Sequence, residues 1–522
     1  MQNEINKKTE ELTKKMMEYF TGFLCETYRK TLCEDLISEK LAGFAKSRNL
    51  KFWQGEKFKN VIIYKDGTGK YKEANFPVIL QAHMDMVCVS SSDKDAEDVF
   101  SEGVQPYFED KEKNKMKGRS VKYPGIITTL GADDGIGVAA ICAILDDKDI
   151  EHPPIAAIFT VEEEDGMGGA DAITKEDITG IAPALDWTKA KLINVDDERD
   201  GIYSVSCAGS LRLDVNLPIK RDLSAPTDVS CYTLSVSGLK GGHSGICIHE
   251  GRANANILLC DVLQKLINAE INLSLFSFNN CGVASNAIPA QASAIIAVSS
   301  QQKELFNSQL KSITNELKNK FAFIDPGLEI KAEFSKNHEK MPYKTNTLRN
   351  LLSLVCELPN GVIAWVDDNI EKVNNDPPLV ETSSNLGIIE ETNETVVLVC
   401  MTRSSVDDKK TKIEKQMEEL ASKYGAKIKK GADSPGWKYK ADNPLRDLFL
   451  LKYDELFKPK EKPRAVAIHA GLECGHFAQK LGEIDMIACG PELSDVHSIK
   501  ETLYMDTVPK VMKLLIAVLE DL

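Results

Sequence analysis

The sequence predicts an α/β protein in which a catalytic layer is interrupted by a second, inserted domain. Strand and helix patterns alternate up to about residue 200 and again from residue 464, which is typical of an α/β layer. Between these parts the pattern changes to two groups that resemble βαββαβ halves, without a convincing sequence repeat. A chain of 522 residues is also too long for one ordinary core. We therefore expect a catalytic domain from residues 1–206 and 433–522 and an inserted domain at 207–432.

The elements of the catalytic parts follow from their apolar patterns. An amphipathic stretch predicts a long helix-like start over about residues 6–44. Strands are expected at residues 60–67, 78–89, 154–164 and 191–198. Helices are expected at residues 133–147 and 505–522, and strand-then-loop units at residues 464–477 and 485–501.

The inserted part alternates strands and helices in a different order. Its helices are expected at residues 252–269, 303–321, 347–358 and 411–425. Its strands are expected at residues 231–245, 275–286, 292–300, 328–335, 386–391, 394–405 and 426–431. The prolines and glycine of residues 432–444 mark the connection back to the catalytic domain.

The composition excludes several classes of partner. A net charge of −15 disfavours nucleic acid and anionic membranes. No apolar run reaches the roughly 18 residues of a membrane span, and the charged start lacks the apolar core of a signal peptide. The 13 cysteines are odd in number and contain no CxxC pair, which favours free thiols in a reducing compartment. We therefore expect a cytoplasmic protein.

Acidic and histidine side chains gather where the predicted strands of the catalytic domain end. Such strand ends are where sites form in open α/β sheets. Each group alone is also explained by ordinary structure, as a buried ion pair, a solvated loop or a turn. The residues concerned are His83, Asp85, Asp133, Asp134, Glu162, Glu163, Glu164, Asp165, Asp196 and Asp197.

Taken together, these groups predict a metal site. Clustered carboxylates at a sheet edge are costly unless cations lie among them. Imidazole and carboxylate ligands without cysteine suit Zn²⁺, Co²⁺ or Mn²⁺, and two ions about 3.5–4 Å apart would share one carboxylate. Strand alternation puts His83 and Asp85 on one face, so Asp85 can accept the second ring N–H of the histidine and fix its tautomer.

The motifs resemble those of a known family. "HMDMV", "GADDGIG", "EEEDGM", "NVDDE", "GGHSG…GRANAN", "NAIP", "HAGLECG" and "HSIKE" stand in the order seen in cytosolic Xaa-His (aminoacyl-histidine) dipeptidases. These belong to the dizinc exopeptidases, with carnosinases, tripeptidases and aminoacylases. The resemblance runs from about residue 50 to the end. It implies a dizinc exopeptidase-like catalytic domain with an inserted α+β lid.

The resemblance also implies ligands for two divalent ions, most often Zn²⁺. It assigns His83 and Asp196 to one ion, Glu164 and His497 to the other, and Asp133 to both. His469, beside Glu473 in a glycine-rich loop, is the rival of His497, but related enzymes place the closing histidine where His497 stands. His469 and Glu473 are then expected on the substrate side, near the free amine of a dipeptide.

Catalytic and substrate-binding roles follow from the same resemblance. Glu163 is expected to be the general base, with Asp85 as the acid that accompanies it. His243, in the lid, is expected to help bind the scissile carbonyl, a role that the partner subunit often supplies. The candidates for holding the substrate or its terminal carboxylate are Arg252, Asn286 and Arg403.

Three positions depart from the family pattern. Asp134 stands where asparagine is usual, and Glu162 stands where aspartate is usual. Neither change removes a ligand. Ala290 stands where an arginine is frequent, which bears on substrate range and not on the chemistry.

These observations predict a metal-dependent dipeptidase that hydrolyses Xaa-His dipeptides and a broader range through a metal-activated water and a glutamate base. One alternative is an aminoacylase or carboxypeptidase-like amide hydrolase of the same family. Another is a non-catalytic metal-binding relative. The resemblance implies a homodimer formed through the lid domain.

Overall fold

The computed structural model describes residues 2–224, 226–335, 340–366 and 380–522. The chain forms two compact units. The first comprises Met1–Ser206, Tyr439–Ala467 and Glu473–Leu522, and the second comprises Cys207–Lys438 and Ile468–Leu472. The domain boundaries drawn from the sequence, at 206/207 and 432/433, stay a prediction about which parts fold independently.

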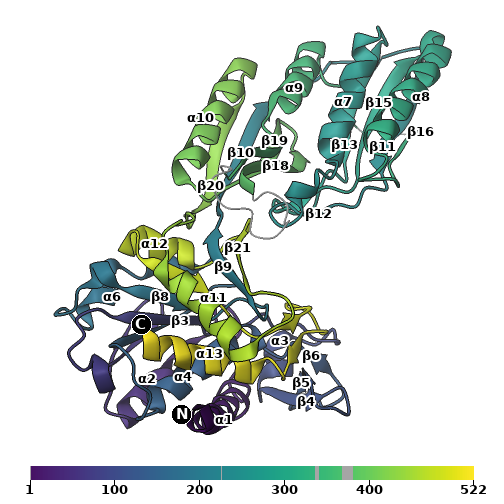
Figure 1. The fold of residues 1–522 in the computed structure, drawn as a ribbon. Helices are drawn as coiled ribbons and strands as arrows, with labels where there is room; N and C mark the ends of the chain where they lie inside the picture. The colour runs from purple at the N-terminus through teal and green to yellow at the C-terminus, as the bar shows by residue number, and fades with distance from the viewer. Residues whose placement is uncertain (1, 225, 336–339, 367–379) are drawn as a thin grey trace. The chain divides into compact units, whose positions relative to one another are not determined.

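An eight-stranded mixed sheet forms the centre of the first unit (Figure 1). Its order is β1 (Lys51–Gln54), β2 (Val61–Lys65), β7 (Ile155–Thr160), β3 (Val78–His83), β8 (Lys191–Asn194), β22 (Asp485–Ala488), β9 (Ile202–Cys207) and β21 (Arg464–Ile468). The four adjacent strands β7, β3, β8 and β22 run parallel. Every residue of β3 and β7 is buried, as expected for parallel strands covered on both faces.

Helices cover this sheet, and a small second sheet lies beside it. The apolar helix α4 packs on β3 and on α1, and α11 packs beside α13 (Figure 1). The helices are α1 (Gln2–Tyr19), α2 (Asp35–Ser47), α3 (Ala96–Phe100), α4 (Ala132–Asp146), α5 (Gly168–Ala172), α6 (Lys175–Gly180), α11 (Pro444–Phe457), α12 (Cys474–Leu481) and α13 (Val508–Asp521). The second sheet contains β4 (Val104–Phe108), β5 (Lys115–Ser120), β6 (Ile127–Thr128), β23 (Leu493–Ser494) and β24 (Thr502–Tyr504).

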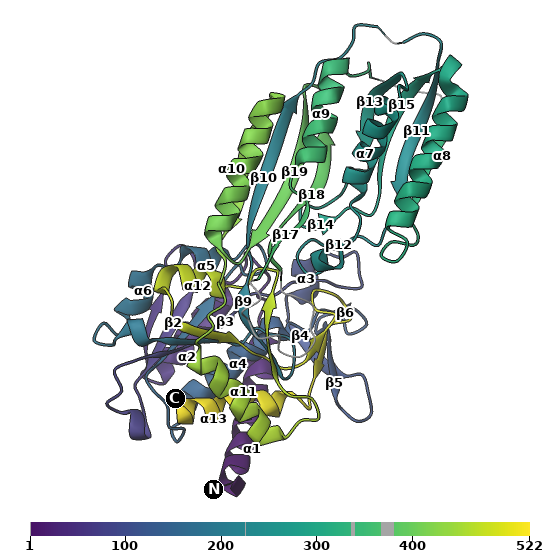
Figure 2. The same ribbon diagram turned by 45° about the horizontal axis from the view of Figure 1, so that its top comes forward.

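The second unit contains two antiparallel sheets, each with two helices (Figure 2). The four-stranded sheet has the order β13 (Leu273–Asn279), β15 (Ala292–Ser299), β11 (Val229–Ser237) and β16 (Glu329–Phe334), with helices α7 (Ala255–Asn268) and α8 (Lys303–Lys320). The five-stranded sheet has the order β17 (Gly361–Trp365), β18 (Val380–Glu391), β19 (Thr395–Ser404), β10 (Gly209–Pro218) and β20 (Lys427–Ser434), with helices α9 (Thr345–Glu357) and α10 (Asp407–Tyr424). The short strands β12 (Gly242–His243) and β14 (Ala287–Ile288) pair with each other.

The predicted fold class is confirmed, including the two βαββαβ halves. The first half is β11-α7-β13-β15-α8-β16, and the second is β10-α9-β18-β19-α10-β20 with β17 added at the edge. The second half begins before the first one in the chain, because its first strand is β10. The sequence analysis missed β10, although its residues alternate between buried and half-exposed in the way a half-covered strand does.

The prediction of one long helix over residues 6–44 is wrong for the segment between Tyr19 and Asp35. Helix α1 ends at Tyr19, a π-helical turn covers Phe20–Leu24, and the next long helix begins at Asp35. Between them the backbone of Arg29 and Thr31 hydrogen-bonds to Met86, through Met86 N to Arg29 O at 3.0 Å and Thr31 N to Met86 O at 3.4 Å. This long-range pairing overrides the local helical pattern.

The strand predicted at residues 78–89 is too long. Strand β3 ends at His83, opposite the last residue of β7, Thr160, and beyond the last partner in β8. Among the described residues, the pairing of β3 with β7 and β8 stops at this point, and Asp85 lies in a loop. Strand alternation therefore does not determine which way the side chain of Asp85 points, although that side chain still lies within ion-pair distance of the ring of His83.

Within the described residues, no helix combines the length and the apolar character needed to cross a membrane. All 13 cysteines of the chain are free thiols.

A buried cap of the second unit provides a stability prediction. Asn254 caps α7 by accepting from the N–H groups of Asn256 and Ile257 at 3.0 and 3.2 Å, and it donates to Leu386 O at 3.0 Å. Asn254→Ala should therefore lower the local free energy of unfolding by about 2–3 kcal/mol, measured by hydrogen exchange of α7 amides in urea. Asn268→Ala, at an exposed position of the same helix, should change it by less than about 0.5 kcal/mol. Equal exchange in the two variants would contradict this account.

Candidate metal centre

The predicted ligands follow strands that are adjacent and parallel. His83 is the last residue of β3, Glu163 and Glu164 follow β7, and Asp196 follows β8. The carboxyl ends of parallel neighbours meet at one edge of the sheet, so these side chains converge there. Sheet topology therefore gathers residues that are far apart in the chain.

Asp133 contacts both histidines of the predicted site. It stands at the start of α4, where it and Asp134 have non-helical backbone angles. Its Oδ1 lies 3.1 Å from His83 Nε2, and its Oδ2 lies 2.9 Å from His497 Nε2. One carboxylate thus faces two imidazoles with one oxygen each, which is the arrangement that a bridging ligand needs.

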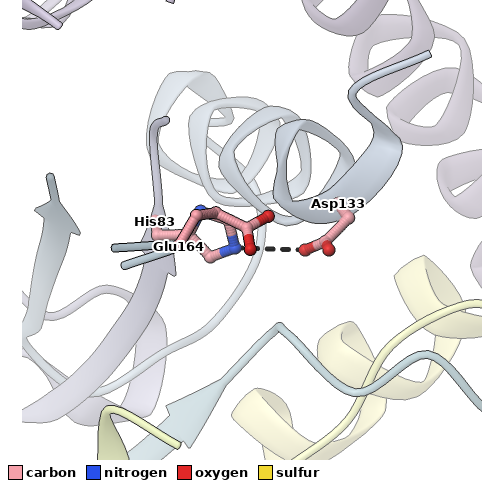
Figure 3. Close-up of side chains that lie close together, drawn as sticks. All are labelled: His83, Asp133 and Glu164. Atoms are coloured by element: carbon pink, nitrogen blue, oxygen red, sulfur yellow. Dashed lines mark hydrogen bonds and ion pairs between the residues drawn. The ribbon is translucent and has the colours of Figure 1, made fainter. Parts of the chain in front are cut away.

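Two further carboxylates complete the cluster. Glu164 Oε2 lies 2.9 Å from His497 Nε2, and Asp196 Oδ1 lies 3.5 Å from His83 Nε2. Figure 3 shows the ring of His83 turned toward the carboxylate of Asp133, with Glu164 beside it. Ligand atoms within 4.8 Å of one another form two groups in the described residues, His83–Asp133–Glu164 and His83–Asp134–Asp196.

Asp85 holds the surroundings of these ligands in place. Its Oδ1 lies 3.4 Å from His83 Nδ1, within ion-pair distance but outside hydrogen-bond geometry. It also accepts from the N–H groups of Glu163 at 3.1 Å and Glu164 at 3.3 Å, and from Thr31 Oγ1 at 3.0 Å. The carboxylate therefore fixes the loop after β7 as well as the imidazole.

The protonation of the site reflects its excess of buried carboxylates. Burial lowers the pKa of His83, but Asp196 and Asp133 raise it well above the ordinary value. Hydrogen bonds to Asp133 and Glu164 raise the pKa of His497 to about 11. Burial raises the pKa of Asp196 to about 6 and that of Glu163 well above its usual range. Without cations, protons must neutralise this cluster.

The donor set fits a divalent metal ion. Its atoms are imidazole nitrogen and carboxylate oxygen, and neither group of candidate ligands contains cysteine. The buried Oε1 atom of Glu164 has no hydrogen-bond partner among the described residues, so one ligand atom is left to a cation.

His497 and His469 occupy different surroundings. His497 belongs to the cluster through its contacts with Asp133 and Glu164, and its side chain is 49% exposed. His469 belongs to the second unit, where its Nε2 lies 2.7 Å from the hydroxyl of Ser383. His497 therefore lies among the other candidate ligands, and its role as a metal ligand stays a prediction.

In the second unit, His243 and Arg403 face each other with donor atoms. Nδ1 of His243 accepts from the N–H groups of Gly245 at 3.2 Å and Ile246 at 3.1 Å, so the proton of the neutral ring is on Nε2. That Nε2 lies 3.4 Å from Nη2 of Arg403. Burial lowers the pKa of His243 to about 4 and that of Arg403 to about 10. Two donors with no acceptor between them suit an anionic group.

The other residues predicted to bind substrate either bond to protein groups or are exposed. Arg252 forms a two-pronged pair with Glu250, at 3.0 and 2.7 Å, and also donates to Gly241 O. Asn286 is exposed, and its carbonyl accepts from Ser244 N at 2.8 Å. Glu473 is buried in the first unit, where it accepts from Thr160 Oγ1 at 2.7 Å and from Gln81. Their contact with substrate stays a prediction.

Sequence reasoning assigned no role to three residues close to this cluster, although Asp134 was among its candidates. Asp134 accepts from the backbone N–H of His83 at 3.2 Å and from that of Gly137 at 3.1 Å. Glu501 and Arg29 bind the backbone of the loop that carries Asp133. Glu501 is the acid at the end of "HSIKE", so the motif itself pointed to it, whereas nothing in the local sequence distinguishes Arg29.

Residues 79–521 match the model of the peptidase family M20/M25/M40, and the chain belongs to that family. The resemblance stated from the motifs is thereby confirmed. The chain is 32% identical over 500 residues to a cytosol non-specific dipeptidase of Escherichia coli K12, covering 96% of each. It resembles the crystal structure of an aminoacylhistidine dipeptidase from Vibrio alginolyticus with a TM-score of 0.84 and 29% identity, covering 97% of this chain and 96% of that one. A tripeptidase from Staphylococcus aureus, at 14% identity, a TM-score of 0.56 and 98% coverage of both chains, shares the fold.

The different surroundings of His497 and His469 lead to a prediction about metal content. His497→Ala should reduce the amount of metal bound per chain, because it removes one candidate imidazole ligand. His469→Ala should leave the content unchanged, since that ring contacts Ser383 and not the cluster. Elemental analysis of both dialysed variants measures the difference. The reverse pattern would transfer the ligand role to His469.

Proposed function

We propose that this protein is a metal-dependent dipeptidase that hydrolyses dipeptides of the Xaa-His type and a broader range. The observation that carries the proposal is the carboxylate of Asp133, which faces His83 with one oxygen and His497 with the other. Similarity to the two dipeptidases supports the substrate class.

Five residues would hold the ions, which we propose to be Zn²⁺, with Co²⁺ or Mn²⁺ as substitutes. His83 and Asp196 would hold one ion, His497 and Glu164 the other, and Asp133 both. Asp134 is better placed to orient this set, because its oxygens accept from backbone N–H groups. When bound, divalent ions lower the pKa of a coordinated water and polarise the substrate carbonyl.

Glu163 is proposed to move the protons. Its backbone is fixed by Asp85, and burial raises the pKa of its side chain, which favours holding a proton between two steps. It takes a proton from the attacking water, whose oxygen bonds to the carbonyl carbon. When the C–N bond breaks, the same proton passes to the leaving amine, and the carboxylate is restored.

His243 and Arg403 are proposed to bind the anionic groups of the reaction. The Nε2–H of His243 would donate to the oxyanion that develops on the carbonyl oxygen. The guanidinium of Arg403 has no carboxylate within ion-pair distance among the described residues, so a substrate carboxylate would compensate it. We also propose a homodimer through the second unit, in which His243 serves either its own chain or the partner.

Cytosolic location is part of the proposal. The free state of all 13 cysteines supports it, as does the similarity to a dipeptidase named for the cytosol.

Metal removal and a substrate panel test the proposed reaction. Chelation and dialysis should abolish hydrolysis of Xaa-His dipeptides, and added Zn²⁺, Co²⁺ or Mn²⁺ should restore it. The panel should include other dipeptides and the N-acylated form of each. Faster hydrolysis of the N-acylated members would indicate an aminoacylase or carboxypeptidase-like enzyme instead. Metal binding without hydrolysis of any member would indicate a non-catalytic relative.

The neighbours Glu163 and Glu164 provide a matched pair of variants. Glu164→Gln should weaken metal binding, and excess metal should partly restore activity. Glu163→Gln keeps the side-chain shape but cannot accept a proton, so it should bind two ions and lose a factor of about 10²–10⁴ in kcat. Metal titration and steady-state kinetics measure both. Exchanged phenotypes would reverse the two roles, and a fully active Glu163→Gln would exclude the mechanism.

A further inference from the structure

The loop of residues 130–133, which carries Asp133, is bound by a buried carboxylate. Glu501 is 2% exposed. Its Oε2 accepts from the N–H groups of Leu130 at 2.7 Å and Gly131 at 3.1 Å. Its Oε1 accepts from Ala132 N at 2.8 Å and lies 3.4 Å from Asp133 N. One side chain thus satisfies four consecutive amides just before and at the proposed bridging ligand.

A buried arginine binds the same loop through its carbonyl groups. Arg29 is 1% exposed, and its Nη2 donates to Gly131 O. Its Nη1 donates to Met84 O at 3.1 Å and Asp85 O at 2.8 Å, directly after His83. Arg29 therefore ties the end of β3 to the loop of Asp133, and so holds two proposed ligands in register.

The glycines of "GADDGIG" make room for this guanidinium. A Cβ atom on Gly131 would lie 2.6 Å from Arg29 Nη2, and one on Gly135 would lie 2.5 Å from it. Gly131 also has a φ of 73°, which disfavours any larger residue. The motif and Arg29 are therefore parts of one packed arrangement, although about a hundred residues of chain separate them.

The two buried charges compensate each other through the backbone. Among the described residues, the hydrogen bonds of both side chains go to backbone groups. Gly131 bonds both, with its N–H on Glu501 and its C=O on Arg29. The N–H groups of the loop therefore face the negative charge of Glu501, and the C=O group of Gly131 faces the positive charge of Arg29. Loss of either side chain would leave the other charge and several backbone groups poorly satisfied.

We propose that Arg29 and Glu501 are a coupled pair of positioning residues, which hold the loop of residues 130–133 so that Asp133 faces both His83 and His497. The inference rests on the proposed metal site. It extends that site to the segment before β3, because Arg29 lies outside residues 79–521 that match the family.

The test titrates metal-free protein with Co²⁺ and records its d–d absorption spectrum, which reports ligand geometry independently of activity. Glu501→Gln keeps the size of the side chain but sets an amide against two backbone N–H groups. Arg29→Lys keeps the charge but cannot span both carbonyl sites. Each variant should bind Co²⁺ about 10–100-fold more weakly, with an altered spectrum. In the double variant the loss should be smaller than the product of the single losses, because the two residues hold one loop.

A matched pair in the second unit serves as control. Arg221 donates to Phe276 O at 2.9 Å and pairs with Glu391, whose side chain is 4% exposed. Arg221→Lys and Glu391→Gln should lower thermal stability and leave Co²⁺ affinity and spectrum unchanged. Glu501→Asp, which keeps a carboxylate, should recover part of the affinity lost in Glu501→Gln, so a general loss of folding is distinguished from loss of positioning.

The outcomes separate this inference from the proposed function. Absence of Co²⁺ binding by the unmodified protein would overturn the metal site and the inference together. Two bound Co²⁺ ions with the same affinity and spectrum in the protein, Glu501→Gln and Arg29→Lys would overturn the inference alone. Fully multiplicative losses in the double variant would overturn the coupling between the two residues.

Discussion

The carboxylate of Asp133 between two imidazoles is the contact around which the candidate metal centre of the first unit is arranged. It lies 3.1 Å from the ring of His83 and 2.9 Å from that of His497, and Glu164 and Asp196 crowd the same histidines. So much negative charge in a buried place is unstable without compensation. Its effect on the histidines is visible in their raised pKa values. A divalent cation would compensate the same negative charge.

The surrounding structure is organised to hold that cluster despite its repulsion. The carboxyl ends of the parallel strands β3, β7 and β8 lie at one edge of the sheet. Asp85 then fixes the loop after β7, while Arg29 and Glu501 fix the loop before α4. These contacts mostly bind backbone groups, which leaves the ligand side chains themselves free to face one another. Rigid support of this kind is what a metal site with defined geometry requires.

The two units differ in the charge that they present. The first gathers carboxylates suited to cations, whereas the second places Arg403 and the Nε2–H of His243 together with no anionic partner among its described residues. A dipeptide has a carbonyl that becomes anionic during attack and a terminal carboxylate. In the proposed reaction, the donors of the second unit would bind such anionic groups.

The sequence by itself predicted the α/β class, the two βαββαβ halves and a group of acidic residues with His83 at strand ends, because apolar periodicity and residue chemistry are local properties. The choice of His497 as a ligand followed only from the family resemblance. The sequence did not reveal the break between α1 and α2, the end of β3 at His83, or the strand β10, since each depends on a partner distant in the chain. The placement of His497 with Asp133, and of His469 with Ser383, likewise required three dimensions. Arg29 is the clearest case. Its sequence context is typical of a helix, and the carbonyl groups that it binds come together only when the end of β3 packs against the loop of Asp133.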